Sequence, residues 1–169
     1  SNVSCNTGGW VYNAPTTLVS NTAGATRVLV GTSTHRCALV GAEVRCWGTS
    51  TAGALASGMS SSTSATLAGG ITDAVDFALG TDSTLIVRAD GSIRAFGSNT
   101  NAQLGVGDTM PRPMGATVAL PPGVRASRIA MFASRACAIT EDRALYCWGA
   151  GGLSAFLPGS SPWPTPVLV

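Results

Sequence analysis

Four of the five cysteines stand in two pairs whose spacing suits a covalent crosslink. Cys37 and Cys46 are nine positions apart, and Cys137 and Cys147 are ten positions apart. Disulfide bonding and metal binding are the two chemistries open to such residues. A metal site needs further ligands, and the sequence has neither a CxxC motif nor a histidine cluster. Disulfide chemistry fits better, provided that the fold brings each pair together.

One histidine and a group of aspartates are the other candidates for chemistry. A Ser-His-Asp site built on His35 would also need a nucleophile, and no Gly-x-Ser-x-Gly elbow occurs. Four aspartates within 18 positions suggest calcium or a glycosidase pair, although turn and strand-edge roles explain them more simply. They are Asp73, Asp76, Asp82 and Asp90. We expect His35 to be structural and predict no catalytic residue, no metal and no cofactor.

The composition excludes several classes of partner. The glycine-rich loop 97–108 lacks the Gly-Lys-Ser/Thr ending of a P-loop. The net charge is only +2, and the ten basic residues, all arginine, are scattered rather than gathered in a stripe for nucleic acid. No run of about 18 apolar residues exists, so we predict no membrane span.

The strands and turns that must position the cysteines, the histidine and the aspartates come from a sequence pattern that occurs three times. Segments 36–48, 84–97 and 136–149 share one pattern, which ends in an aromatic residue and glycine. The aromatic residues, Trp47, Phe96 and Trp148, lie 49 and 52 positions apart. A period near 50 indicates a repeat architecture.

A second marker gives the same period and sets the boundaries. Four aliphatic residues that follow Thr or Pro are spaced by 49, 51 and 49 positions: Leu18, Leu67, Val118 and Val167. We therefore predict an N-terminal extension over residues 1–14 and three repeats over roughly 15–66, 67–117 and 118–169.

Each repeat contains an expected β-hairpin. If Cys37 pairs with Cys46, then Gly41 and Ala42 form a two-residue loop with glycine first, as a type II′ turn requires. The second hairpin has a three-residue loop that ends in Gly91, a residue suited to the left-handed conformation. The third hairpin would place an arginine in that conformation, so its turn signal is the weakest.

The hairpins alternate in polarity with the period of two that marks β-strands. One face of each hairpin is apolar or cysteine, and the other carries the aromatic ring. The apolar faces comprise Cys37, Leu39, Val44 and Cys46; Leu85, Val87, Ile93 and Ala95; and Cys137, Ile139, Leu145 and Cys147. The 21 glycines and 9 prolines argue against long helices, so we predict an all-β fold.

The second repeat decides how the cysteines are interpreted, because Leu85 and Ala95 occupy their positions there. Opposed residues on antiparallel strands lie about 4.5–5.5 Å apart, within disulfide reach. We predict one hairpin disulfide within each cysteine pair, with free buried thiols as the alternative. Disulfides persist in oxidising compartments, so we expect an extracellular, cell-surface or periplasmic protein.

Three residues near the chain ends are possible interface residues. Cys5 lies outside the repeats and is either a free thiol or the partner of a cysteine elsewhere. Trp10 and Trp163 lie outside the repeated Trp-Gly positions. They are either exposed anchors of the kind enriched at interface hot spots or caps on the first and last repeats.

The repeats resemble those of the regulator of chromosome condensation family, especially its cysteine-bearing bacterial versions. The resemblance rests on HRCALVGAEVRCWG, DGSIRAFGSNTNAQLGVGD and CAITEDRALYCWG and covers residues 15–169. Loop 97–105 matches the family's Gly-x-Asn-x-x-Gly-Gln-Leu-Gly, with Ala102 in place of a glycine, whereas 48–55 keeps less of it and 149–153 little. In that family each repeat is one four-stranded propeller blade, and about seven blades close a ring.

Three such blades cannot close a ring alone, so the resemblance implies a partial β-propeller or an open arc. The chain would be part of a larger propeller, or an oligomer of like subunits, or an arc covered by protein partners. We therefore expect a non-enzymatic module for protein interaction or for assembly of an extracellular structure. The alternatives are an inhibitor of a secreted enzyme, which one β-lactamase inhibitory protein of similar repeats suggests, and a propeller domain accessory to a secreted hydrolase.

Overall fold

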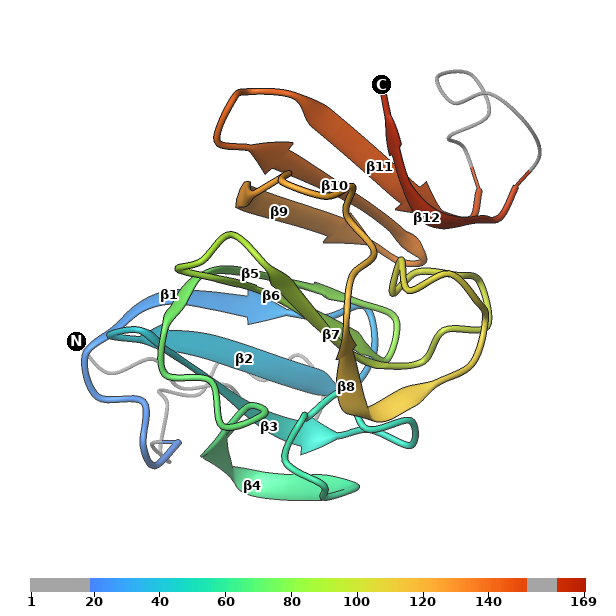
Figure 1. Ribbon diagram of the computed structural model, residues 1–169. Coiled ribbons are helices and arrows are strands. Elements are labelled where there is room, and N and C mark those ends of the chain that lie inside the picture. Colours follow the sequence, from blue (N-terminus) through green and yellow to red (C-terminus); the bar gives the residue numbers. More distant parts are fainter. Residues whose placement is uncertain (1–18, 152–160) are drawn as a thin grey trace.

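The computed structural model describes residues 19–151 and 161–169, and these residues form strands, turns and loops without a helix. Twelve strands form three four-stranded antiparallel sheets. Each sheet is a meander in which consecutive strands pair, with the orders β1-β2-β3-β4, β5-β6-β7-β8 and β9-β10-β11-β12. Figure 1 shows the sheets stacked as successive blades, with the first at the bottom and the third at the top.

The strands of each blade have the following bounds. Blade 1 comprises β1 Ala25–Val30, β2 His35–Val40, β3 Glu43–Thr49 and β4 Ser61–Leu67. Blade 2 comprises β5 Ala74–Gly80, β6 Ser83–Arg88, β7 Ile93–Gly97 and β8 Arg112–Thr117. Blade 3 comprises β9 Ala126–Phe132, β10 Arg135–Thr140, β11 Leu145–Gly149 and β12 Trp163–Leu168.

The three predicted hairpins have the predicted register. In blade 1 the strands β2 and β3 pair up to Val40 and Glu43, which leaves a two-residue loop that begins with Gly41 at φ 60°. Gly91, at φ 78°, ends the loop of blade 2. The arginine in the corresponding place of blade 3, Arg143, adopts φ 69°. This turn therefore has a strained residue where blade 2 has glycine.

Both predicted disulfides are present, and they mark one face of the blades. Cys37 is bonded to Cys46, and Cys137 is bonded to Cys147. We call this side of each sheet the cysteine face, and the side that carries the repeated ring the aromatic face. The strand registers show which residues lie on this face in each blade. There is one set of equivalent residues per blade, and the set of blade 2 contains no cysteine. The sets are Leu29, Cys37, Leu39, Val44 and Cys46; Ala78, Leu85, Val87, Ile93 and Ala95; and Ala130, Cys137, Ile139, Leu145 and Cys147.

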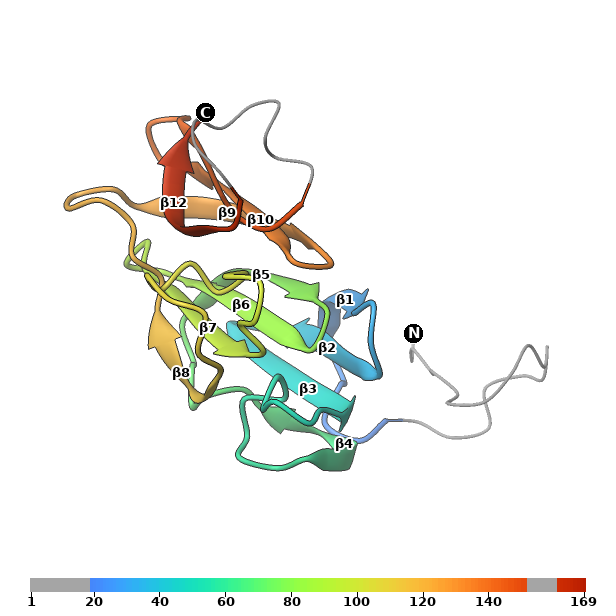
Figure 2. The ribbon, with the colours of Figure 1, turned by 90° about the vertical axis from the view of Figure 1, so that its right-hand side faces the viewer.

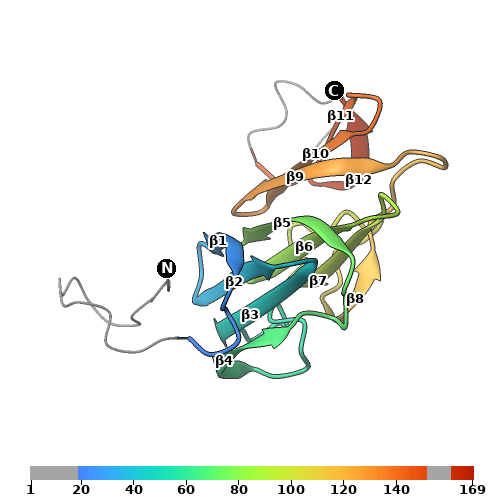
Figure 3. The same cartoon turned by 90° about the vertical axis from the view of Figure 1, so that its left-hand side faces the viewer.

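The core lies in two junctions where a cysteine face packs on the aromatic face of the next blade. In the first junction the Cys37–Cys46 disulfide and Val44 share a buried cluster with Phe77 and Phe96 of blade 2. In the second, the cysteine face of blade 2 packs on blade 3, and the cluster includes Trp148. The inner strands β1, β5 and β9 follow one another across these junctions (Figures 2 and 3). The blades therefore stack in one direction, always cysteine face to aromatic face.

The glycine-rich loop after β7 belongs to this packing. Asn99 is fully buried, donates to the carbonyl of Asp108 and accepts a hydrogen bond from the Leu104 amide. The carbonyl of Gln103 accepts the indole N–H of Trp148 at 2.9 Å. The loop thus anchors the ring of blade 3 on blade 2.

Candidate functional site

Among the described residues, the cysteine face of blade 3 is the one cysteine face that no other blade covers, although Trp163 of its own outer strand packs on the disulfide. Its apolar residues are exposed, with relative accessibilities of 47% for Ile139, 38% for Leu145 and 65% for Phe132. The corresponding residues of blade 2, Val87 and Ile93, are fully buried beneath blade 3. The residues exposed on this side, which we call the open face, are Arg128, Ala130, Phe132, Ile139 and Leu145.

The inner strand carries a charged residue at the same place in all three blades. This residue is Arg27 in blade 1, Asp76 in blade 2 and Arg128 in blade 3. The three are equivalent because they pair, in the same order, with Leu39, Val87 and Ile139, which occupy one position of the hairpins. Arg27 donates to the Asp76 carboxylate of blade 2, and its guanidinium lies 5.3 Å from the Phe77 ring centre. Arg128, in contrast, lies on the open face without an acidic neighbour within ion-pair distance among the described residues.

Asp76 joins all three blades. One carboxylate oxygen accepts from Arg27 of blade 1 and from the Phe77 amide, and the other accepts from the Ile129 amide of blade 3 at 2.9 Å. Asp76 lies within β5 and is buried, so the sequence-based assignment of this residue to a turn or strand edge is wrong. The aligned repeats do contain a signal for its structural role, because each repeat has a charged residue at this position.

The end of the inner strand shows a second difference between the blades. One position at the end of the inner strand is occupied by Gly31 in blade 1, Gly80 in blade 2 and Phe132 in blade 3. The three residues are equivalent because each directly follows the inner-strand residue that pairs with the second residue of the next strand. A side chain at Gly80 would put its Cβ 2.4 Å from the carbonyl oxygen of Ala133 in blade 3. The glycine therefore permits the close approach of the next blade. Blade 3 has a large exposed ring at this place.

The Cys137–Cys147 disulfide lies beside the open face and is covered at one end. Trp163 of β12 is 5% exposed and packs with Cys147, Cys137 and Val167. Its burial against the disulfide agrees with the predicted cap on the last blade and not with an exposed anchor. Cys5 and Trp10 lie outside the described residues.

The sequence-predicted catalytic candidates do not converge. His35 is fully buried, and its ring nitrogens hydrogen-bond to the hydroxyls of Ser33 and of Thr84 in blade 2. Burial lowers the pKa of His35 below its ordinary value, partly offset by Asp82. Among the described residues, no group of three or more His, Cys, Asp or Glu side chains could hold a metal ion.

The other aspartates have local partners. Asp73 forms an ion pair with Arg88. Asp90 accepts from the amide and hydroxyl of Ser92 and so closes its turn. The Asp82 carboxylate accepts from Thr51 and from the Ala52 amide of blade 1. These residues therefore fix turns and link loops.

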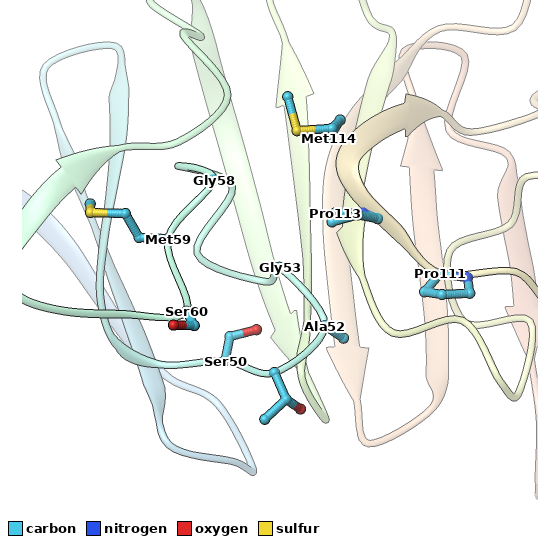
Figure 4. Close-up of a pocket in the computed structure, with 10 residues that line it drawn as sticks. Ser50, Ala52, Gly53, Gly58, Met59, Ser60, Pro111, Pro113 and Met114 are labelled. Carbon is cyan, nitrogen blue, oxygen red and sulfur yellow. The ribbon is translucent and has the colours of Figure 1, made fainter.

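A pocket of about 400 Å³ lies at the rim between blades 1 and 2. Figure 4 shows Met59 on the loop of blade 1 and Met114 and Pro113 on β8. None of the ten lining residues carries an ionisable side chain, so the lining provides no carboxylate or imidazole for acid–base chemistry. Exposed methionines are suited to adaptable apolar contacts.

In the described part of the chain, no helix is long and apolar enough to cross a membrane.

Comparisons with known proteins agree with this architecture. No family model matches the chain. Over 74 residues the chain is 36% identical to the ultraviolet-B receptor UVR8 of Arabidopsis thaliana, a match that covers 44% of this chain and 17% of the receptor. The structure is similar to human WBSCR16, with a TM-score of 0.76 and 20% identity, over 90% of this chain and 40% of that one.

Yeast RCC1 (Prp20), solved in complex with Kap60, is also similar. Its TM-score is 0.69 at 17% identity, and the match covers 86% of this chain and 37% of that one. This chain therefore spans about two fifths of the length of these two solved structures and about one sixth of the receptor.

The fold and the open face together define an incomplete β-propeller, in which three blades form an arc that does not close. The repeats of this arc are similar in sequence to part of the receptor UVR8, and the arc shares the fold of yeast RCC1, so both comparisons agree with repeats of the regulator of chromosome condensation type.

Proposed function

We propose that the chain is a non-enzymatic protein-interaction module of a secreted or cell-surface protein and that it binds its partner through the open face of blade 3. The observation that carries this proposal is the exposure of Phe132, Ile139 and Leu145 on one side of one sheet. Grouped exposed apolar side chains mark interaction sites. The corresponding faces of blades 1 and 2 are both covered by protein.

The charge on this face specifies the partner further. Arg27 of blade 1 uses its guanidinium to bind a carboxylate of the element that covers it. Arg128 occupies the same place on the open face. The partner of the open face therefore presents apolar side chains and a carboxylate to Arg128.

Two observations support the remaining parts of the proposal. The pocket of the rim has no ionisable lining residue, and His35 is engaged by hydroxyl groups, which favours a binding role over catalysis. The two disulfides favour an oxidising compartment, and hence secretion. Yeast RCC1 (Prp20), which has a similar fold, was solved bound to Kap60 and studied for its binding to Gsp1p and histones, and this supports protein binding as a use of such blades.

Site-specific photo-crosslinking tests this proposal. A photoreactive residue is placed at Ile139 or, as the control, at the exposed Val75 of blade 2, and the protein is irradiated in its native secretory setting. We expect a discrete crosslinked protein from position 139 that disappears with Arg128→Glu. Equal crosslinking from both positions, or a product unaffected by Arg128→Glu, would contradict the proposal.

A further inference from the structure

A groove follows the outer rim of the first junction, between the loop that precedes β4 of blade 1 and strand β8 of blade 2. It begins in the pocket of Figure 4, which has Met59 on the blade 1 side and Met114 on the blade 2 side. Two further pockets, of about 490 and 360 Å³, continue it, and each pocket shares lining residues with the next. We call the three together the rim groove. Because its walls belong to blades 1 and 2, the groove is complete whatever follows blade 3.

The first two pockets of the rim groove are apolar and open to solvent. Met59 and Met114 line both pockets and are 41% and 79% exposed. Gly58 and Gly70 also line the groove, and a Cβ placed on either would meet no atom within 4 Å. Methionine side chains adapt to the shape of an apolar partner, and bare glycine lets another main chain approach closely. The groove therefore suits a polypeptide that carries an apolar side chain.

The middle pocket lies beside a smaller ring than the one in the second junction. Phe96 takes the place of Trp148, whose indole N–H donates to the Gln103 carbonyl of the preceding blade. Ala56 corresponds to Gly105, since both have positive φ and donate to the carbonyl three residues earlier. A Cβ at Gly105 would lie 2.7 Å from the indole nitrogen, so the larger ring requires glycine there. Ala56 and Phe96 both line the middle pocket, where the smaller ring leaves room for a side chain of a partner.

The far end of the rim groove carries a guanidinium without a carboxylate partner. Arg94 lies 5.7 Å from the Phe96 ring centre and donates to the Thr117 hydroxyl at 3.3 Å. Arg45 occupies the same position before the ring of blade 1 and forms an ion pair with Glu43, where blade 2 has a serine. Among the described residues, Arg94 forms no ion pair. Its guanidinium is thus held in place and available to an acid.

The other charged residues of this third pocket do not supply that acid. Asp73 accepts two hydrogen bonds from Arg88, at 3.0 and 2.9 Å, and Arg88 also forms an ion pair with Asp90. The pocket therefore has a paired carboxylate, a paired guanidinium and the guanidinium of Arg94. This end of the rim groove complements a negative charge.

From the two unlike ends we infer that the rim groove binds an extended segment of a partner protein, which places an apolar side chain between Met59 and Met114 and a carboxylate against Arg94. Successive pockets suit an extended chain, because its alternate side chains reach successive sites. Guanidinium and carboxylate groups form strong, directional hydrogen bonds. The rim groove is distinct from the open face, so this inference goes beyond the proposed function.

Peptide selection tests the inference. Random dodecapeptides displayed on phage are selected on the wild-type chain, and the enriched sequences are synthesised and measured by fluorescence anisotropy. We expect a motif with an apolar residue and an Asp or Glu at a fixed spacing. Met114→Glu and Arg94→Gln should each raise its Kd by about tenfold or more, since each removes a direct contact. The matched control is Met110→Glu, because Met110 is 62% exposed and lines none of the three pockets, and it should leave the Kd unchanged.

A charge exchange tests the contact with Arg94 itself. Arg94→Glu should abolish binding of the selected peptide, and a peptide with Arg in place of its acidic residue should recover it. Thermal unfolding checks that each variant is folded. The inference is overturned if no peptide is enriched, or if enriched peptides bind the Met114→Glu and Arg94→Gln chains as tightly as the wild type. Peptides lost only with Arg128→Glu would overturn the rim groove and support the open face, so the two proposals can fail separately.

Discussion

The cysteine faces of blades 2 and 3 have the same strand order and register but opposite surroundings. In blade 2 the inner-strand residues Asp76, Ala78 and Gly80 are all buried, whereas their counterparts in blade 3 are all exposed. The sequence differs in the same sense, since an acidic residue and a glycine suited to close packing are replaced by Arg128 and Phe132. The repeat therefore determines the blade, and a few positions on its face determine what can dock on it.

The largest expected difference concerns equivalent aliphatic residues. Ile93 is fully buried in the second junction, and Leu145 is its exposed counterpart. Ile93→Ala should lower the free energy of unfolding by about 2–5 kcal/mol, because it removes buried methyl groups and leaves a cavity. Leu145→Ala should change it by only about 0.5 kcal/mol. Urea unfolding of both variants measures the contrast, and similar losses would show that the two faces are equally covered.

The charged positions should give the next largest contrast. Asp76→Ala removes the acceptor for the Ile129 and Phe77 amides and the partner of Arg27. We expect a loss of about 2–3 kcal/mol in the free energy of unfolding, because buried donors are left unsatisfied. The matched variant Arg128→Ala should lie within about 0.5 kcal/mol of the wild type. An Asp76→Ala protein as stable as Arg128→Ala would contradict the joining role of this carboxylate.

The two disulfides should differ in their access to reductant. Cys37 and Cys46 are both fully buried in the first junction, whereas Cys137 is only partly buried beside the open face. Under native conditions a thiol reductant should therefore open the Cys137–Cys147 bond first, since exchange requires access to sulfur. Alkylation at timed intervals followed by peptide mass spectrometry gives the order. Earlier labelling of Cys37 would argue that the first junction is the looser one.

The smallest effect concerns the hydrogen bond that crosses the first junction between His35 and Thr84. Burial lowers the pKa of His35, so the folded protein disfavours the protonated ring relative to the unfolded chain; Asp82 opposes this shift and Arg36 adds to it. The resulting contribution is complete above about pH 6.5 and is lost as the pH falls through and below that ordinary value. Comparing urea unfolding at pH 7.5 and pH 5, His35→Gln should flatten this part of the profile. An unchanged profile would exclude His35 as its source.

Sequence reasoning identified the repeated hairpins because the pattern is local. A hairpin is specified by alternating polarity and by a glycine at its turn, so the register of Cys37 with Cys46 followed without knowledge of neighbouring blades. The repeat comparison also contained the changes at Arg128 and Phe132, but only the spacing between blades shows why they matter. Gly80 has no left-handed φ to explain it, and the requirement comes from the Ala133 carbonyl of another repeat.

Features that depend on contacts between repeats were accordingly missed or left open. The role of Asp76 was assigned wrongly because its partners lie 49 and 53 residues away. The sequence admits both an exposed and a capping role for Trp163, because its contact with the Cys137–Cys147 disulfide depends on the path of β12. In a repeat protein, the sequence of a single repeat thus predicts the structure of its blade well, but it predicts the contacts of that blade with its neighbours poorly.

Hydroxyl-radical footprinting of the wild-type chain, read by mass spectrometry, tests most directly the claim that blade 3 ends in an open face. Each oxidation rate reports the solvent exposure of one side chain, and equivalent residues of blades 2 and 3 serve as internal controls. We predict rapid oxidation of Phe132, Ile139 and Leu145 and protection of Val87 and Ile93. Protection of the first group to the same degree as the second would contradict the account.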